Sequence, residues 1–363
     1  MRGSMPIDGA HGYRLVAIGQ PLERFEFPPL EPGPDEVVVE VSGCGICHTD
    51  VGFAVDGVPT RKLLPLVLGH EISGRVVAAG ENAGAWLGRL VIVPAVVPCG
   101  NCPACRANRP TICRNQFMPG NDGDGGFATH VRAPARGLCP VPEPLPPGLS
   151  AELLSVVADA VTTPWEAIRR ASVGPEDVAV FVGVGGVGGF GVQIAAALGA
   201  AVIAIDVDRM KLELAAQHGA GLTLDSSAMT EKDLKTAVRN FVKQSGRKNI
   251  GLKIFETSGT PGGQQTAFGL IDFGGYLAVV GFTPRKVELR LSNLMALDAT
   301  ARGNWGCPPD QYPVALDLVL RGQVAIESYV EVHSLDDAPA VFDSVARHSI
   351  TRRAILKHVA NGT

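Results

Sequence analysis

Four of the eight cysteines in the 363-residue chain lie within one short segment, at Cys99, Cys102, Cys105 and Cys113. This C-x2-C-x2-C-x7-C spacing lets a single loop wrap four thiolates around a tetrahedral Zn²⁺. Such a site leaves no coordination position for a substrate, so it would serve folding rather than catalysis. An iron–sulfur cluster uses the same ligands and stays an alternative. A nucleic-acid-binding zinc knuckle is disfavoured because no aromatic residue stands between these cysteines.

A second, more dispersed pair of metal-ligating residues is Cys47, in the segment GCGICHTD at residues 43–50, and His70, in the segment GHE at residues 69–71. A catalytic zinc takes about three ligands from the protein and keeps one position open. A cysteine and a histidine supply two of them. A lone histidine is more often a hydrogen-bonded structural residue, so this pair by itself does not establish a metal site.

A glycine-rich turn follows the apolar run 178–182 and matches G-x-G-x-x-G with the residues Gly183, Gly185, Gly186, Val187 and Gly188. Glycines at such a turn let the backbone approach a pyrophosphate at a helix N-terminus. Asp206 ends the next strand-like run, where a carboxylate can hydrogen-bond the adenosine ribose and repel a 2′-phosphate. The pattern therefore predicts NAD rather than NADP, although the nearby Arg209 works against that preference. The alternative is a glycine turn and a strand-end aspartate without a ligand.

The elements that must position these residues change in character along the chain. Short β-rich runs at 36–41 and 74–78, separated by Gly and Pro, predict a small irregular β-barrel. The segment 140–147 contains five prolines, which excludes a helix or central strand and indicates a domain boundary nearby. Strands then alternate with helices, as in a parallel sheet covered on both faces. The strands are predicted at 178–182, 201–205, 253–256 and 276–281, and the helices at 191–198 and 209–218.

Composition sets the broad class of the protein. With 46% hydrophobic residues and a formal net charge of -4, the chain is long enough for two packed domains and carries no global field that would recruit nucleic acid or an anionic membrane. No stretch approaches the roughly 20 apolar residues of a membrane span, and the start has no signal-peptide core. We therefore expect a cytoplasmic protein whose clustered cysteines bind metal instead of forming disulfides.

From about Tyr13 to Leu356 the chain resembles the zinc-containing medium-chain alcohol dehydrogenases. The resemblance is carried, in chain order, by the GICHTD segment, the GHE segment, the four cysteines and the glycine turn. It implies an α/β fold in which a Rossmann doubly wound parallel sheet is inserted into a GroES-like β-barrel catalytic domain. The expected domains are a catalytic domain at 1–157 with a structural zinc lobe at 99–113, an NAD-binding domain at 158–298 and a completion of the catalytic domain at 299–363.

The same resemblance implies a catalytic zinc on Cys47 and His70, with Glu71 as an adjacent or exchangeable carboxylate, and hence two zinc ions per chain. The usual third ligand is a cysteine, but none occurs between Cys139 and Cys307. Asp159 is similar to the aspartate that replaces it in some members. The alternative role for Asp159 is the N-cap of a helix at 160–169. Zinc in such a site lowers the pKa of a bound alcohol, whose hydride then passes to the nicotinamide.

Further roles follow from the resemblance. Thr49 is similar to the hydroxyl residue that receives the alcohol proton, and Gly52 stands where many relatives carry a relay histidine. We expect His48 and Arg353 near the cofactor pyrophosphate, and a further cofactor contact from Thr163. As in the resembling family, we expect a homo-oligomer, either a dimer or a tetramer, that acts on a small-molecule substrate.

The substrate prediction rests on the segments TTPW, ETSG, LSNLMA and NWGC at 162–165, 256–259, 291–296 and 304–307. They are similar to the branch of the family that oxidises 6-hydroxycyclohex-1-ene-1-carbonyl-CoA to a ketone with NAD. Candidate partners for the CoA phosphates are Arg61, Lys62 and Arg302, and Trp305 is a candidate lining of a ring pocket or plain core. The alternatives are a general secondary or aromatic alcohol dehydrogenase and a non-catalytic NAD-binding family member.

Overall fold

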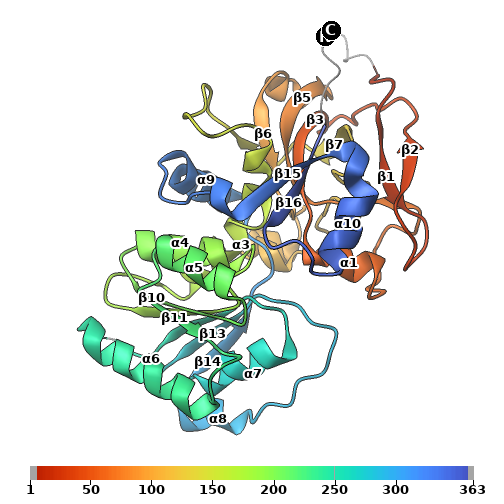
Figure 1. Cartoon of the computed structure of the whole chain (residues 1–363). Coiled ribbons are helices and arrows are strands. Elements are labelled where there is room, and N and C mark those ends of the chain that lie inside the picture. The colour runs from red at the N-terminus through yellow and green to blue at the C-terminus, as the bar shows by residue number, and fades with distance from the viewer. Residues whose placement is uncertain (1–5, 249, 359–363) are drawn as a thin grey trace. The chain divides into compact units, whose positions relative to one another are not determined.

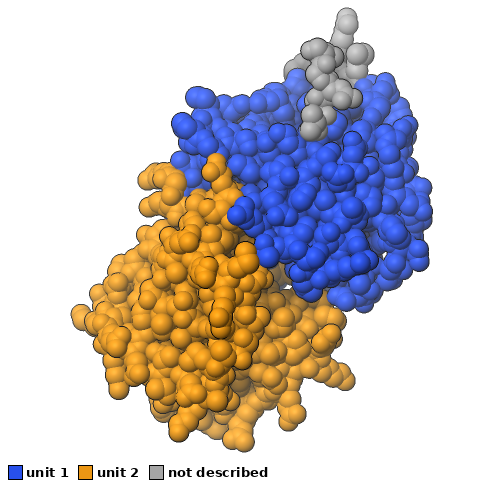
Figure 2. Space-filling view, viewed as in Figure 1, with its two compact units in different colours: residues 1–162, 306–320, 330–363 blue, residues 163–305, 321–329 orange. Residues whose placement is uncertain are grey.

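A computed structural model describes residues 6–248 and 250–358 (Figure 1). The chain divides into two compact units, drawn in blue and orange in Figure 2. Unit 1 comprises residues 1–162, 306–320 and 330–363, and unit 2 comprises residues 163–305 and 321–329. None of the described helices is both long and apolar enough to cross a membrane.

Unit 1 is built on two sheets of mostly antiparallel strands. The larger has the order β15-β16-β3-β5-β6-β8, with β7 pairing β3. Its strands are β3 (Glu36–Gly45), β5 (Glu71–Ala79), β6 (Leu90–Val93), β7 (His130–Pro134), β8 (Cys139–Pro140), β15 (Val330–Ser334) and β16 (Arg353–Lys357). The smaller has the order β2-β1-β4, formed by β1 (His11–Leu15), β2 (Glu23–Glu26) and β4 (Leu66–Val67). The β-rich fold expected for this part of the chain is confirmed, and the C-terminal strands β15 and β16 complete the larger sheet.

Short helices join the strands of unit 1. The α-helices are α1 (His48–Ala54), α2 (Pro103–Arg106), α9 (Tyr312–Leu320) and α10 (Ala338–Ala346). Turns of 3-10 helix cover Gly84–Trp86, Pro110–Ile112, Leu153–Ala158, Pro309–Gln311 and Leu335–Asp337. Aliphatic side chains of β3, β5 and β6 fill the core together with Phe127 and Phe342, whose rings pack edge to face.

Unit 2 contains a parallel sheet in the order β11-β10-β9-β12-β13-β14. This is the order 3-2-1-4-5-6 of a doubly wound Rossmann sheet, as predicted. The strands are β9 (Val178–Val182), β10 (Ala201–Asp206), β11 (Leu222–Asp225), β12 (Lys253–Glu256), β13 (Tyr276–Val279) and β14 (Thr300–Gly303). The helices are α3 (Thr162–Arg170), α4 (Gly188–Ala197), α5 (Arg209–Gln217), α6 (Glu231–Ser245), α7 (Pro261–Gly269) and α8 (Ser292–Ala296), and a 3-10 turn covers Glu327–Tyr329.

The boundaries of the two units differ from those expected at 157/158 and 298/299, and the contacts explain why. Residues 299–305 stay with unit 2 because β14 pairs in parallel register with β13. Residues 321–329 also belong to unit 2, where the backbone N–H of Ala325 donates to Gln193 Oε1 over 2.7 Å. The segment 299–363, which was expected to belong wholly to the first domain, is therefore divided: residues 306–320 and 330–363 belong to unit 1, and residues 321–329 belong to unit 2.

Candidate active site

The four-cysteine lobe brings its thiols together within one loop of unit 1. The Sγ atom of Cys102 lies 3.5 Å from the Sγ of Cys105 and 3.7 Å from the Sγ of Cys113. The Sγ atoms of Cys99 and Cys105 are 4.0 Å apart. Tetrahedral zinc with bonds of about 2.3 Å separates its sulfur ligands by about 3.8 Å. The cysteines are free thiols. Their arrangement fits one zinc ion with no change of fold.

The charge of this lobe also favours a cation. Hydrogen bonds from the backbone N–H groups of Asn101 and Cys102 lower the pKa of the Cys99 thiol to about 6. Burial and the neighbouring thiols raise the pKa of Cys105 to about 11. The Cys99 thiolate is thus favoured by its hydrogen bonds, whereas a thiolate at Cys105 would be favoured by the charge of a bound cation.

A second cluster forms where β3, β5 and β16 meet. Cys47 is the N-cap of α1, just after β3, and His70 immediately precedes β5. The strand register sets Gly45 of β3 opposite Glu71 of β5 and beside Ile355 of β16. A side chain at Gly45 would overlap the Glu71 carboxylate, so only glycine fits there.

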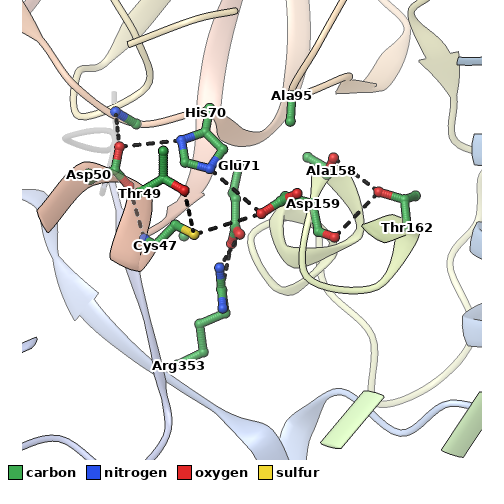
Figure 3. Close-up of polar contacts among 12 residues, drawn as sticks. Cys47, Thr49, Asp50, His70, Glu71, Ala95, Ala158, Asp159, Thr162 and Arg353 are labelled. Carbon is green, nitrogen blue, oxygen red and sulfur yellow. Dashed lines mark hydrogen bonds and ion pairs between the residues drawn. The ribbon is translucent and has the colours of Figure 1, made fainter. Parts of the chain in front are cut away.

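Three of the predicted ligands converge in this cluster (Figure 3). Asp159 Oδ2 lies 3.7 Å from both Cys47 Sγ and His70 Nε2. The ligand atoms of Cys47, His70, Glu71 and Asp159 all lie within 4.8 Å of one another. His70 is 2% exposed, whereas the Asp159 side chain is 16% exposed. The cluster is thus closed on the histidine side and accessible beside the aspartate, as an open metal site requires.

Asp50 fixes the orientation of His70. This fully buried carboxylate lies 3.3 Å from His70 Nδ1 and accepts the backbone N–H groups of Cys47 and Gly69. A carboxylate on one imidazole nitrogen directs the other nitrogen towards a metal. Asp50 belongs to the GICHTD segment, but no role was predicted for it from the sequence. The signal was the spacing of three residues from Cys47, which the structure uses as a capping box.

The charges around the cluster favour a metal ion. Burial opposes protonation of His70, but Asp50, Asp159 and Cys47 together raise its pKa well above the ordinary value. The same acidic groups that favour a proton on this buried histidine would favour a bound cation. Cysteine, histidine and aspartate are zinc ligands, so the residues fit Zn²⁺.

Glu71 is engaged by a different partner. Arg353 Nε donates to Glu71 Oε2 over 2.7 Å, and Nη2 donates to Oε1, so the buried pair is bidentate. Burial raises the pKa of Glu71 to about 7 although Arg353 lowers it. This geometry assigns both Glu71 oxygens to Arg353 and leaves Asp159 as the carboxylate facing Cys47 and His70. The expected contact of Arg353 with phosphate stays a prediction.

Tyr312 positions the backbone beside Asp159. Its fully buried hydroxyl donates to Ala158 O over 2.5 Å and accepts Ala95 N–H over 3.1 Å. Burial raises the pKa of this phenol well above its usual range, so it stays a donor. Helix α3 begins at Thr162 and not at residue 160, which removes Asp159 from the N-cap position considered as its alternative role. Tyr312 could not be predicted from the sequence, because it is far from Asp159 along the chain and no motif links the two.

Two predicted residues lie at the rim of the cluster. Thr49 Oγ1 is 3.6 Å from Cys47 Sγ, and the side chain is partly exposed. His48 is exposed and stacks on His348, with Nε2 and Nδ1 3.3 Å apart. His348 was not predicted; it has a φ of 55°, a conformation uncommon for a histidine.

The glycine turn of unit 2 has the expected arrangement. Gly183 has a φ of 88°, and a side chain there would collide with Ser258. Asp206 Oδ2 accepts the N–H of Val184 over 2.7 Å, which joins the strand-end carboxylate to the turn. Gly185, Gly186 and Val187 are partly exposed, and Gly188 is the first residue of α4. Thr163 is buried and its carbonyl accepts Asn304 Nδ2 over 3.2 Å.

Two of the three cationic residues considered for binding the CoA phosphates form ion pairs with carboxylates. Arg61 pairs with Asp122 over 3.1 Å and Lys62 with Asp124 over 2.5 Å. Arg302 is exposed on β14, and Trp305 is 48% exposed. The first two cations therefore already have carboxylate partners.

Comparison with known proteins gives matches over most of the chain. Residues 33–143 match the alcohol dehydrogenase GroES-like domain, and residues 186–321 match the zinc-binding dehydrogenase domain. An alcohol dehydrogenase of Geobacillus stearothermophilus is 28% identical over 93% of this chain and 95% of its own length. An NAD-dependent alcohol dehydrogenase of Sulfurisphaera tokodaii is 31% identical over 64% of this chain and 68% of its own length. The structure of acetophenone reductase from Geotrichum candidum in complex with NAD is similar with a TM-score of 0.82, at 26% identity and 98% coverage of both chains.

Proposed function

We propose that this chain, which belongs to the zinc-binding medium-chain alcohol dehydrogenase family, oxidises a secondary alcohol to a ketone with NAD. Membership makes the chain an alcohol dehydrogenase-type oxidoreductase that uses zinc and a nicotinamide dinucleotide. The observation that carries the proposal is the convergence of Cys47, His70 and Asp159 on one partly open point.

The residues of the cluster would have different roles in the reaction. Cys47 thiolate, neutral His70 and Asp159 carboxylate would hold a zinc ion and together balance its two positive charges. Zinc bound there supplies a Lewis acid that lowers the pKa of an alcohol oxygen. Asp50 keeps His70 Nε2 directed at the cluster. Thr49 would receive the alcohol proton and pass a proton on toward solvent; this role is supported by its Oγ1, which lies 3.6 Å from Cys47 Sγ on a partly exposed side chain.

The four cysteines of the lobe would hold the second zinc, which supports the fold and leaves no position for substrate. The cofactor preference for NAD is supported by Asp206, the acid at the end of β10. Homo-oligomer formation is supported by β14, the edge strand of the unit 2 sheet, all four of whose residues are exposed. Light scattering should then give at least twice the 37.9 kDa of one chain, and a monomer would contradict this assembly.

For the substrate, the narrower proposal is 6-hydroxycyclohex-1-ene-1-carbonyl-CoA, a ring secondary alcohol carried on a thioester. It is supported by the segments at 162–165, 256–259, 291–296 and 304–307. A free secondary or aromatic alcohol is the second candidate. It is favoured by the similarity to acetophenone reductase and by the ion pairs that already hold Arg61 and Lys62.

Steady-state kinetics with NAD decides between these substrates. The kcat/KM for the cyclic hydroxyacyl-CoA is compared with that for the free cyclic alcohol and for 1-phenylethanol. A CoA substrate should exceed both free alcohols by about a hundredfold or more, because the CoA moiety adds binding interactions remote from the reacting carbon. Equal or better turnover of a free alcohol would reject the CoA thioester and support the general alcohol dehydrogenase.

A further inference from the structure

Three carboxylates and two cations surround the end of β10 in unit 2. Asp206 of β10 and Asp225 of β11 stand opposite each other in parallel register. Asp208 caps α5, accepting the N–H groups of Met210 and Lys211. Arg209 begins α5 and Lys211 follows one half-turn later. This group lies beside the glycine turn, because Asp206 accepts the N–H of Val184.

Each cation in this group is paired with a carboxylate other than Asp206. Arg209 Nε lies 3.2 Å from Asp225 Oδ2, and Lys211 Nζ lies 3.8 Å from Asp208 Oδ2. Asp206 instead accepts backbone N–H groups, from Val184 on one oxygen and from residues 207 and 208 on the other. Among the ion pairs of the described residues, none involves Asp206. At this strand end, where a dinucleotide fold binds the adenosine ribose, the charge of Asp206 is therefore not neutralised by an ion pair.

The hydrogen bonds of Asp225 orient its carboxylate toward Arg209. Its Oδ1 accepts the N–H and hydroxyl of Ser227 over 3.0 and 2.5 Å, which leaves Oδ2 for the guanidinium. Hydrogen bonding from Ser227 and the charge of Arg209 lower the pKa of Asp225, so it is ionised at neutral pH. The Asp225 side chain is 18% exposed and that of Arg209 is 80% exposed. The carboxylate is fixed, whereas the guanidinium is free to move if released.

We propose that Asp225 is a specificity-determining residue that selects NAD over NADP by holding Arg209 away from the cofactor 2′ position. An arginine near that position is the group that accommodates a 2′-phosphate. With Asp225 present, Arg209 is neutralised and the uncompensated carboxylate of Asp206 repels the phosphate. Selectivity for NAD thus depends on two carboxylates: Asp206 repels the 2′-phosphate, and Asp225 holds Arg209 away from it. The inference rests on the proposed NAD-dependent function.

The test is a double-mutant cycle on Asp225 and Arg209, read as the ratio of kcat/KM for NADP to that for NAD. The dissociation constants of NADP and NAD, measured by titration calorimetry without any alcohol, give the same ratio for binding alone. Asp225→Asn should raise this ratio about tenfold, the size of one charge-assisted contact with phosphate. In the Arg209→Ala background the same substitution should have no effect. Glu213→Gln is the matched control, since it removes one negative charge from an exposed position of α5 and should leave the ratio unchanged.

An unchanged ratio in Asp225→Asn would overturn the inference, and so would an equal rise when Arg209 is absent. A rise in the Glu213 control of the same size would also overturn it, because net charge alone would then be responsible. Asp206→Ser, measured alongside, separates this failure from failure of the proposed function. If Asp206→Ser raises the ratio and Asp225→Asn does not, NAD selectivity stands and Asp225 has no part in it. If Asp206→Ser has no effect, the proposed role of Asp206 fails.

Discussion

The two metal-binding clusters of unit 1 are assembled in opposite ways. The four-cysteine lobe draws all its ligands from residues 99–113, and its thiols lie against one another. The second cluster draws Cys47, His70 and Asp159 from separate elements, joined by the pairing of β3 with β5 and by the turn after Leu153–Ala158. A closed site needs only a loop, whereas a site that keeps one position open needs a fold to hold its incomplete ligand set in place.

The supporting contacts show the same difference. Cys47 and His70 are fixed by Asp50, and the backbone before Asp159 is fixed by Tyr312. In the lobe, the contacts of the thiols are with one another and with neighbouring loop residues such as Asn101. Loss of a ligand should therefore affect chemistry in the Cys47–His70–Asp159 cluster and folding in the four-cysteine lobe.

The largest effect is expected from Asp159→Ala. Removal of this carboxylate leaves Cys47 and His70 as an incomplete ligand set, so activity should fall by about a thousandfold or more. Zinc content should fall from two ions per chain to one, and the melting temperature should change little. Asp159→Cys is the control, because it restores a ligand of the same charge and should regain zinc. Activity above half of the wild-type value in Asp159→Ala would contradict the assignment.

Cys102→Ser should lower the melting temperature and leave activity nearly unchanged, the reverse of Asp159→Ala. The lobe would lose one of four ligands and with it the folding energy of a closed zinc site. We expect the melting temperature to fall by roughly 10 °C, which corresponds to a few kcal/mol in a domain of this size. The kcat of the protein that remains folded should stay within about threefold of wild type, because the thiol of this residue contacts Cys105 and Cys113 of the same lobe and is not a ligand of the catalytic cluster. Lost activity at an unchanged melting temperature would contradict the structural role.

The smallest effect is expected from Tyr312→Phe. The ring keeps its packing, but Ala158 O loses a donor and Ala95 N–H loses its acceptor. Such a loss costs roughly 1–3 kcal/mol of stability for buried groups. If Tyr312 positions Asp159, zinc should also leave the catalytic cluster about tenfold faster under chelator, with the lobe zinc unaffected. The visible spectrum of the Co²⁺-substituted enzyme should shift as well. Lower stability with unchanged zinc release and spectrum would assign Tyr312 to folding alone.

Sequence patterns predicted what depends on short-range spacing. The cysteine spacing placed the lobe, and the alternation from Val178 to Asp206 placed the Rossmann strands and the glycine turn. Long-range partners carried no such pattern. Asp50 reads as an ordinary helix-capping acid, and Tyr312 as an apolar residue of α9, until the fold brings them to His70 and Ala158. The segment 321–329 was likewise assigned to the wrong unit, since only the contact of Ala325 with Gln193 reveals its place.

Asp159 and Glu71 both lie within reach of Cys47 and His70, so the identity of the third zinc ligand has to be measured. Crystals of the zinc-loaded enzyme measured at the zinc absorption edge test it directly. Two anomalous peaks per chain are expected. One should lie within about 2.3 Å of Cys47 Sγ, His70 Nε2 and an Asp159 carboxylate oxygen, with Glu71 still on Arg353, and the other should lie among the four cysteines. A peak ligated by Glu71 in place of Asp159, or a single peak in the lobe, would contradict Asp159 as the third ligand.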